Sequence, residues 1–107
     1  MQQKTIVSGN SGHSYIAEVY ETRGYYDEKM ISVSLFKVIV KKGLFGKYKE
    51  KRIHLFTCYF EEGHEEYFDY IKAVKKTVLK YESSPAFIKK EGHDANVKQF
   101  EKWNGNV

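Results

Sequence analysis

The sequence contains little of what marks a secreted or membrane-spanning protein. Its single cysteine, Cys58, cannot form an internal disulfide, whereas secreted domains of this size often depend on several. Residues 1–14 lack the basic start and apolar run of a signal peptide. The longest apolar stretch, residues 31–40, is interrupted by serine and lysine and is shorter than a membrane span. We therefore expect a cytoplasmic protein with no membrane partner.

Motifs of common catalytic and cofactor-binding sites are also missing. Ser8, Ser11 and Ser14 surround His13, but the nucleophile elbow G-x-S-x-G is absent. The glycines of residues 43–46 (GLFG) fit neither a dinucleotide-binding turn nor a P-loop. Because these motifs are absent, the sequence predicts neither enzymatic activity nor a bound cofactor.

A metal centre is not expected either. A zinc site needs three or four ligands at matched distances. His54 and Cys58 could share one face of a strand, but no third ligand is marked near them. Free cysteine is among the most buried residue types, so we expect Cys58 in the core.

What the sequence does contain is typical of one globular domain. Of its 107 residues, 41% are hydrophobic and 30% are charged, which excludes a disordered chain. Its formal net charge of +4 bears on its partners and not on its fold. The only proline, Pro85, marks the best internal boundary. We expect a flexible N-terminus or short strand over residues 1–12, a body over 13–82, and a C-terminal appendage over 83–107.

Three segments read as strands because β-branched and aromatic residues alternate in them. They cover residues 13–22, 30–40 and 48–60. In the second, Ile31, Val33 and Leu35 share one face, but the apolar residues that follow Lys37 have the opposite parity. Either a β-bulge near Phe36 and Lys37 changes the face, or both faces are covered.

Residues 64–82 predict a long α-helix, because apolar residues recur at helical spacing. The predicted buried stripe consists of Tyr67, Ile71, Val74, Val78 and Tyr81, with Phe68 and Leu79 at its edges. A short second helix is expected within residues 93–106.

For this second helix Asp94 is the expected N-cap, and Asn104-Gly105 would end it. Val97, Phe100 and Trp103 fall roughly on one side of it. The expected fold class is α+β: a three-stranded antiparallel β-meander followed by a long packing α-helix and a short C-terminal helix. A further short strand around residues 5–8 would fit the N-terminus.

One functional hypothesis starts from apolar residues on both faces of the third strand. Ile53, Leu55 and Tyr59 lie opposite Phe56, Cys58 and Phe60 if the strand is regular. A helix covers only one face, and large exposed apolar patches mark interfaces. Together with Phe45 and Trp103, they predict a non-catalytic protein-interaction module, either a homodimer or a regulator or inhibitor of another protein.

The alternative hypothesis is nucleic-acid binding by the hairpin of residues 41–52 (KKGLFGKYKEKR). Its candidate contacts are Lys41, Lys42, Lys47, Lys49 and Lys51, with Tyr48 available to stack on a base. Charged hairpin tips also keep proteins soluble, and lysines protect sheet edges from unwanted pairing. The sequence leaves this choice open.

Overall fold

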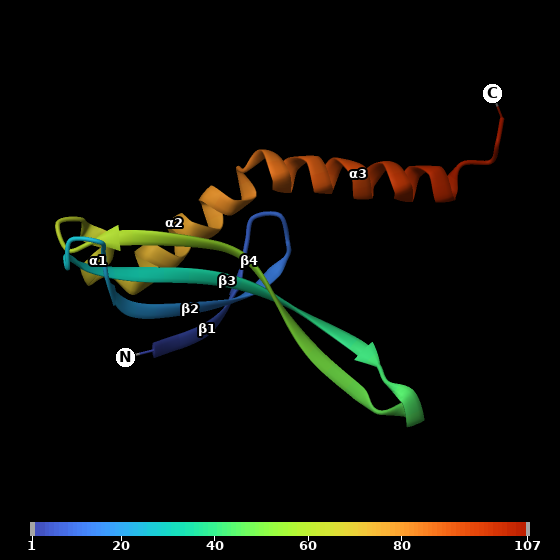
Figure 1. Ribbon diagram of the computed structural model, residues 1–107. Helices are drawn as coiled ribbons and strands as arrows, with labels where there is room; N and C mark the ends of the chain where they lie inside the picture. Colours follow the sequence, from blue (N-terminus) through green and yellow to red (C-terminus); the bar gives the residue numbers. More distant parts are fainter. Residues whose placement is uncertain (1, 107) are drawn as a thin grey trace.

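The computed structural model describes residues 2–106 and shows an α+β fold with one antiparallel sheet and three α-helices (Figure 1). The strands are β1 (Gln2–Ser8), β2 (Ser14–Arg23), β3 (Lys29–Lys42) and β4 (Tyr48–Glu61). The helices are α1 (Glu65–Phe68), α2 (Tyr70–Glu82) and α3 (Pro85–Lys102). The expected fold class is confirmed. The expected number of strands is wrong, because the sheet has four strands in the order β1-β2-β3-β4.

The additional strand is formed by the N-terminal residues. β1 pairs with β2 over its whole length, with Ile6 opposite Ile16 and Ser8 opposite Ser14. A tight turn joins the two strands, in which Gly12 adopts a positive φ of 88°. Because β1 lies at the edge of the sheet, its outer row of backbone groups has no neighbouring strand.

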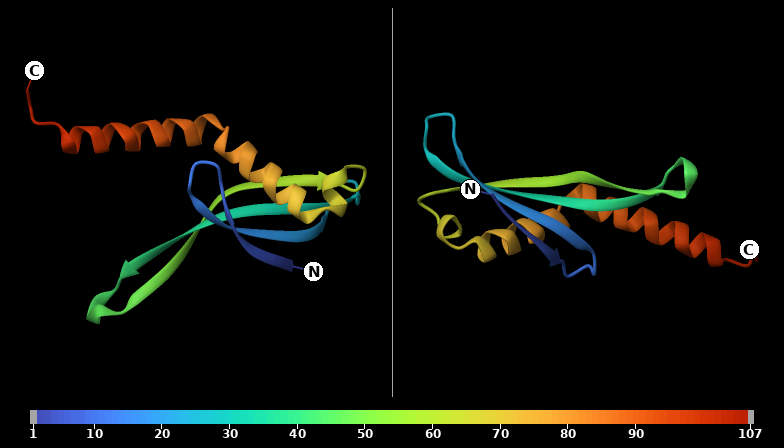
Figure 2. Two further views of the ribbon diagram at one scale, coloured as in Figure 1. Left: turned by 180° about the vertical axis from the view of Figure 1, so that it is seen from behind. Right: turned by 90° about the horizontal axis from the view of Figure 1, so that it is seen from below.

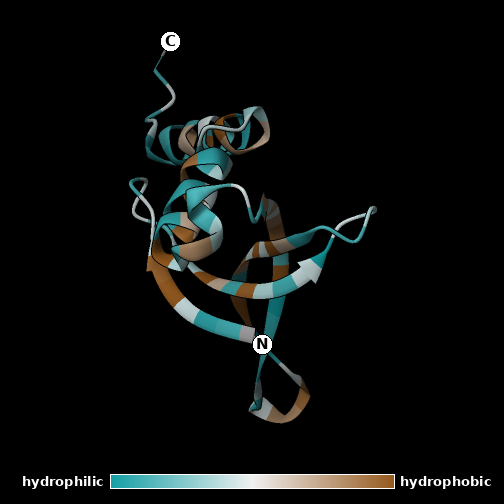
Figure 3. Cartoon of the chain, turned by 90° about the vertical axis from the view of Figure 1, so that its left-hand side faces the viewer, coloured by the Kyte–Doolittle hydropathy of each residue, from teal (hydrophilic) through white to brown (hydrophobic). Residues whose placement is uncertain are grey.

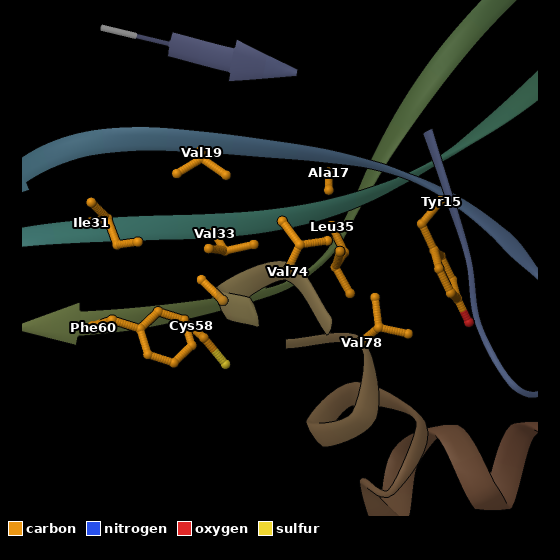
Figure 4. Packing of buried hydrophobic residues seen from close by; sticks show 11 residues of the cluster. Tyr15, Ala17, Val19, Ile31, Val33, Leu35, Cys58, Phe60, Val74 and Val78 are labelled. Carbon is orange, nitrogen blue, oxygen red and sulfur yellow. The ribbon is translucent and has the colours of Figure 1, made fainter. Parts of the chain in front are cut away.

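The core lies between the sheet and α2 (Figure 4). The alternating residues Ile31, Val33 and Leu35 of β3 are completely buried, as the period-two pattern predicts. Cys58 is buried in the same core, where we expected it. Ala17 and Val19 of β2, Phe60 of β4, and Val74 and Val78 of α2 complete the central cluster.

The single long helix expected over residues 64–82 is interrupted at Asp69. The backbone of this residue is extended (φ −137°, ψ 90°), and its carboxylate accepts a hydrogen bond from the Lys72 amide at 3.1 Å. Aspartate is a strong N-cap, so it begins a new helix where periodicity alone suggests a continuous one. The result is a four-residue helix, α1, followed by α2.

The buried face of α2 also differs from the predicted stripe. Val74 and Val78 are buried as expected, but Ile71 is 70% exposed, and burial of this residue was predicted wrongly. The helix instead turns Ala73 and Thr77 toward the sheet, and the Thr77 hydroxyl donates to the Ala73 carbonyl at 2.8 Å. These small side chains allow a close approach to the sheet, and the internal hydrogen bond removes the cost of burying the hydroxyl.

A β-bulge interrupts the pairing of β3 with β4 beside Phe36, where one was expected, but it does not change the face of β3 as predicted. Leu35 pairs with Phe56 and Phe36 with His54, so Leu55 has no partner and is the extra residue. The bulge therefore lies in β4. Leu55 and Phe56 both pack against the core, and the alternation of β4 is reversed on the two sides of the bulge.

Beyond the bulge, β3 and β4 leave the sheet as a two-stranded ribbon. β2 pairs with β3 only up to Phe36, so the segments 37–42 and 48–53 pair with each other alone. We call residues 37–53 the arm and Leu44–Gly46, a 3-10 turn at its end, the tip. In Figure 1 the arm descends from the body toward the lower right.

The C-terminal helix is longer than predicted and begins earlier. The Ser84 hydroxyl caps it by accepting from the Phe87 amide at 3.3 Å, and Pro85 occupies its first turn, where proline is favoured. The predicted N-cap, Asp94, lies in the middle of α3.

The arm and α3 give the molecule an open shape (Figure 2). Its radius of gyration is 17.9 Å. A compact domain of this length would have a radius of about 13 Å. The compact part is therefore the sheet with α2, which we call the body, and two appendages extend from it.

Candidate interaction surfaces

An apolar groove lies between the edge strand β1 and helix α2. α2 packs over β2, β3 and β4, which leaves the inner side of β1 accessible. The groove has a volume of about 830 Å³, and Val7, Val74 and Val78 contribute to its lining. Ile71 and Leu79 on the exposed flank of α2 form part of its wall. This size falls in the range of about 300–1,000 Å³ that is typical of binding pockets.

The start of α3 is fixed to the body by an aromatic and polar cluster that we call the joint. Phe87 packs edge-on against Tyr81, with ring centroids 5.1 Å apart, and Tyr81 packs against Tyr15. The His13 ring contacts the Glu91 carboxylate at 2.6 Å. Residues from the β1–β2 turn, β2, α2 and α3 therefore hold the direction in which α3 leaves the body.

Glu82 is the polar centre of the joint. Its carboxylate accepts hydrogen bonds from the Tyr15 hydroxyl at 2.7 Å and from the Ser11 hydroxyl. Burial alone would raise the pKa of Glu82, but the hydrogen bonds from Ser11 and Tyr15 hold it below its ordinary value. Burial and the adjacent Glu82 carboxylate raise the pKa of Tyr15. Ser11 and His13 thus contact carboxylates on the two sides of the α2–α3 junction, Glu82 and Glu91 respectively.

Most of α3 is solvent-exposed. Within Pro85–Lys102, Phe87 is the only buried residue. Val97, Phe100 and Trp103 follow one another at three-residue intervals. By helical geometry Phe100 and Trp103 lie on the side of α3 away from Phe87, and Val97 lies between the two sides. The rings of Phe100 and Trp103 lie 6.2 Å apart, and the Trp103 indole donates to the Asn106 carbonyl at 3.2 Å. We call these three residues the distal patch; Phe100 is 73% and Trp103 53% exposed.

The two faces of the arm differ in charge. On one face Lys41 is directly opposite Lys49, and Lys51 and Lys37 lie on the same side. We call these four lysines the basic face. The opposite face carries three cross-strand pairs, Val38 with Arg52, Val40 with Glu50, and Lys42 with Tyr48. The only carboxylate of the arm, that of Glu50, therefore lies on the face away from the four lysines.

A fifth lysine joins this surface at the root of the arm. Lys90 of α3 lies beside Lys37 and lowers the pKa of the Lys37 ammonium, an effect that Asp94 partly opposes. The basic face continues the helix-covered side of the sheet. At Lys37 and Lys90 the root of the arm therefore lies near α3. Further out the two appendages diverge (Figure 1).

The tip of the arm is apolar and strained. Phe45 is 98% exposed and has a positive φ of 73°, which is uncommon for a bulky residue. Leu44 beside it is almost as exposed. In Figure 3 the loop at the bottom of the view, which is the tip, carries hydrophobic colour.

The sheet face opposite α2 is polar near its centre. Glu18 is buried there, and its carboxylate accepts hydrogen bonds from Arg52 and, at 3.0 Å, from Tyr20. The guanidinium of Arg52 lies 4.4 Å from the centre of the Phe36 ring. Burial opposes the charge of Glu18, but the hydrogen bonds from Arg52 and Tyr20 hold its pKa below the ordinary value.

The structure disperses the residues that the sequence grouped as a partner surface. Leu55 packs against the core because of the bulge, Ile53 is half-buried at the root of the arm, and Tyr59 alone lies on the open sheet face. Phe45 is at the tip and Trp103 at the far end of α3.

The bulge also separates His54 from Cys58. His54 contacts Phe36 and Thr57 on the open face, whereas Cys58 is buried beneath α2. Within residues 2–106, no group of three or more potential metal ligands is brought together. Among the described helices, none is long and apolar enough to cross a bilayer.

Sequence reasoning missed two features of these surfaces. The groove depends on the lateral position of α2, which no local pattern records. Lys37 was not included with the hairpin lysines, although its odd number places it on the same strand face as Lys41. That parity was a usable signal.

Comparisons with known proteins identified no relative of this chain. No protein-family model matches the chain, and neither the curated proteins nor the solved structures contain a significant match.

Proposed function

We propose that this protein is a non-catalytic interaction module that forms a homodimer, in which the distal patch of each copy occupies the groove of the other. The observation that carries the proposal is the isolation of α3. Helices of fewer than about 12–15 residues are marginal in water, and longer ones in proteins are stabilised mainly by packing. α3 has 18 residues, and its packing against the body is confined to its first turns.

The groove and the distal patch are complementary in character and in length. Both are apolar, and each carries large side chains that are exposed in the single chain. The groove wall from Ile71 to Leu79 spans about 12 Å, and the patch from Val97 to Trp103 about 9 Å, at 1.5 Å per helical residue.

The geometry of the joint favours a second copy over an internal contact. Only Ser83 and Ser84 link α2 to α3, and the His13–Glu91 contact and Phe87 direct α3 away from the body. A two-fold arrangement would use one helix and one groove from each chain, so that both apolar surfaces are covered at once. Without such coverage, each chain would leave both surfaces in water.

The proposal is tested by light scattering over a range of concentrations, with two pairs of variants. We expect a dimer for the natural sequence and a loss of dimer for F100E/W103E, which changes the patch, and for I71E/L79E, which changes the groove. The matched control is Phe68→Glu, because this aromatic residue is equally exposed and does not line the groove.

A mixing experiment distinguishes exchange from any other dimer. The patch variant retains an intact groove, and the groove variant retains an intact patch. An equimolar mixture should therefore form a heterodimer through one of the two contacts, although neither variant dimerises alone. A natural chain that stays monomeric at millimolar concentration would contradict the homodimer and leave a foreign protein as the occupant of the groove.

A further inference from the structure

We propose that the arm is a binding element for duplex DNA, which places its basic face against the phosphates and its tip against the base stack. This inference is independent of the homodimer, because the arm shares no residue with the groove or the distal patch.

The first argument is the arrangement of charge. Like charges directly opposite each other on paired strands destabilise a sheet. The arm nevertheless places Lys41 opposite Lys49, and its root places Lys37 beside Lys90. Glu50, the only carboxylate of the arm, lies on the other face, and Asp94 of α3 only partly offsets the repulsion at Lys37. A surface that gathers cations in this way gains stability when a polyanion covers it, since phosphate contacts release counterions.

The second argument is the shape of the arm. It is a ribbon of two strands whose segments 37–42 and 48–53 have no further strand beside them. A two-stranded ribbon fits the major groove of B-form DNA, which is about 12 Å wide. The major groove of duplex RNA is deep and narrow and does not admit such an element. The ribbon therefore favours DNA among the duplexes.

The third argument is the tip. A hairpin that is charged only for solubility gains nothing from two apolar side chains at its extreme end, where Leu44 and Phe45 are largely exposed. DNA-bending proteins insert side chains of this kind between base steps as wedges. Phe45 also has a positive φ, and backbone strain of this type is concentrated at functional positions.

The test is the binding of the full chain to a mixed-sequence 20-base-pair DNA duplex, measured by fluorescence anisotropy between low and moderate salt. We expect affinity to fall steeply with salt for the natural sequence. In the variant K41Q/K49Q/K51Q the slope of log affinity against log salt should become shallower by about 2.7, since each phosphate contact contributes about 0.9. The control K29Q/K72Q/K80Q removes the same charge from outside the arm and should leave the slope nearly unchanged.

The tip is tested separately with Phe45→Gly. This change leaves every lysine in place, so we expect about tenfold weaker binding, a value typical of one lost stacking contact, with an unchanged salt slope. Thermal melts of each variant show whether the fold is retained before binding is compared.

Four results would overturn the inference. The first is no binding to the duplex at low salt, and the second is an equal loss of salt slope in the arm variant and the control. The third is equal or tighter binding to the corresponding single strand or to duplex RNA. The fourth is tighter binding to polyglutamate than to DNA. The last result would identify the basic face as a site for an acidic protein.

Discussion

Strands β3 and β4 take part in two regions that differ in almost every physical respect. On the body side of the bulge, Ile31, Val33 and Leu35 are completely buried under α2. A few residues further along the same strands, the arm has no buried residue within 37–53. Both regions have the same backbone hydrogen-bonding pattern, so strand pairing alone does not decide where the chain is stable. The difference shows that β3 and β4 are buried only where β2 and α2 pack beside them, with Val7 of β1 at the margin of that core.

The second appendage repeats this contrast in helical form. α2 buries Ala73, Val74, Thr77 and Val78, whereas α3 buries Phe87 alone within Pro85–Lys102. The body is therefore stabilised by a buried core, whereas the appendages consist almost entirely of exposed residues. Substitutions should affect folding in the body and binding in the appendages, and the following expectations test that division.

The largest effect is expected at the centre of the body. Val74→Asp places a carboxylate in the core and should cost more than about 4 kcal/mol, which unfolds a small domain. Ile71→Asp, one turn earlier on the exposed flank, should cost less than about 1 kcal/mol in chemical denaturation at concentrations where the chain is monomeric. Equal losses in the two variants would show that the face of α2 is assigned incorrectly.

The next effect concerns the residue that forms the bulge. Leu55→Ala removes a side chain that packs against the core and should lower the free energy of unfolding by about 2 kcal/mol. Tyr59→Ala, on the open face, should change it by less than about 0.5 kcal/mol. Urea unfolding followed by circular dichroism measures both values, and a larger loss for Tyr59→Ala would mean that β4 is regular at Leu55.

A smaller effect is expected at the joint. Glu82→Gln weakens the hydrogen bonds from Ser11 and Tyr15 and should lower stability by about 1 kcal/mol at neutral pH. Because the pKa values of Glu82 and Glu18 are lowered in the folded chain, their contribution is present at neutral pH. It should be lost as pH falls below about 4.3, the usual value for an unfolded glutamate.

Thermal melts between pH 7 and pH 3 follow this loss. The Glu82→Gln variant should show a weaker decline in melting temperature on acidification than the natural sequence, since it has one fewer carboxylate to protonate. An identical decline in both proteins would assign the acid sensitivity to other groups, such as Glu18.

The smallest effect, and the only favourable one, is expected at the tip. Phe45 is in the left-handed region, which costs roughly 1–2 kcal/mol for a residue with a side chain, and glycine removes that cost. We expect Phe45→Gly to leave stability unchanged or to raise it by about 1 kcal/mol, while it weakens DNA binding. A clear loss of stability would show that the Phe45 ring packs against the arm.

The sequence was sufficient to predict the features that depend on local periodicity. The alternation of Ile31, Val33 and Leu35 identified the buried face of β3, and the change of parity after Lys37 located the bulge within a residue or two. The predicted change of face in β3 does not occur, because β3 is regular and Val38 and Val40 lie on the face opposite the core. The sequence could not show that the extra residue is Leu55, because either strand of a pair can carry a bulge. That ambiguity is the reason why Ile53, Leu55 and Tyr59 were assigned to one surface.

The helices show the same limit. The apolar stripe of residues 64–82 was read as continuous because Ala73 and Thr77 carry little hydrophobic weight, yet they form the contact with the sheet. The N-cap of Asp69 competes with helix propagation, and spacing alone does not reveal which prevails. For the surfaces, the sequence identified the exposed aromatic and basic residues, but the groove depends on where α2 crosses the sheet.

The bulge at Leu55 makes the length of the arm independent of the body. The part that β3 and β4 play in the core is complete at Phe36 and Leu55, and at the root of the arm Arg52 pairs with Glu18 of the body. Residues could therefore be inserted into both strands between Arg52 and the tip in steps of two, which would lengthen the arm and keep every lysine on its present side. Insertion of one residue per strand would instead turn the lysines beyond it to the opposite side. The arm is in this respect a spacer of adjustable reach.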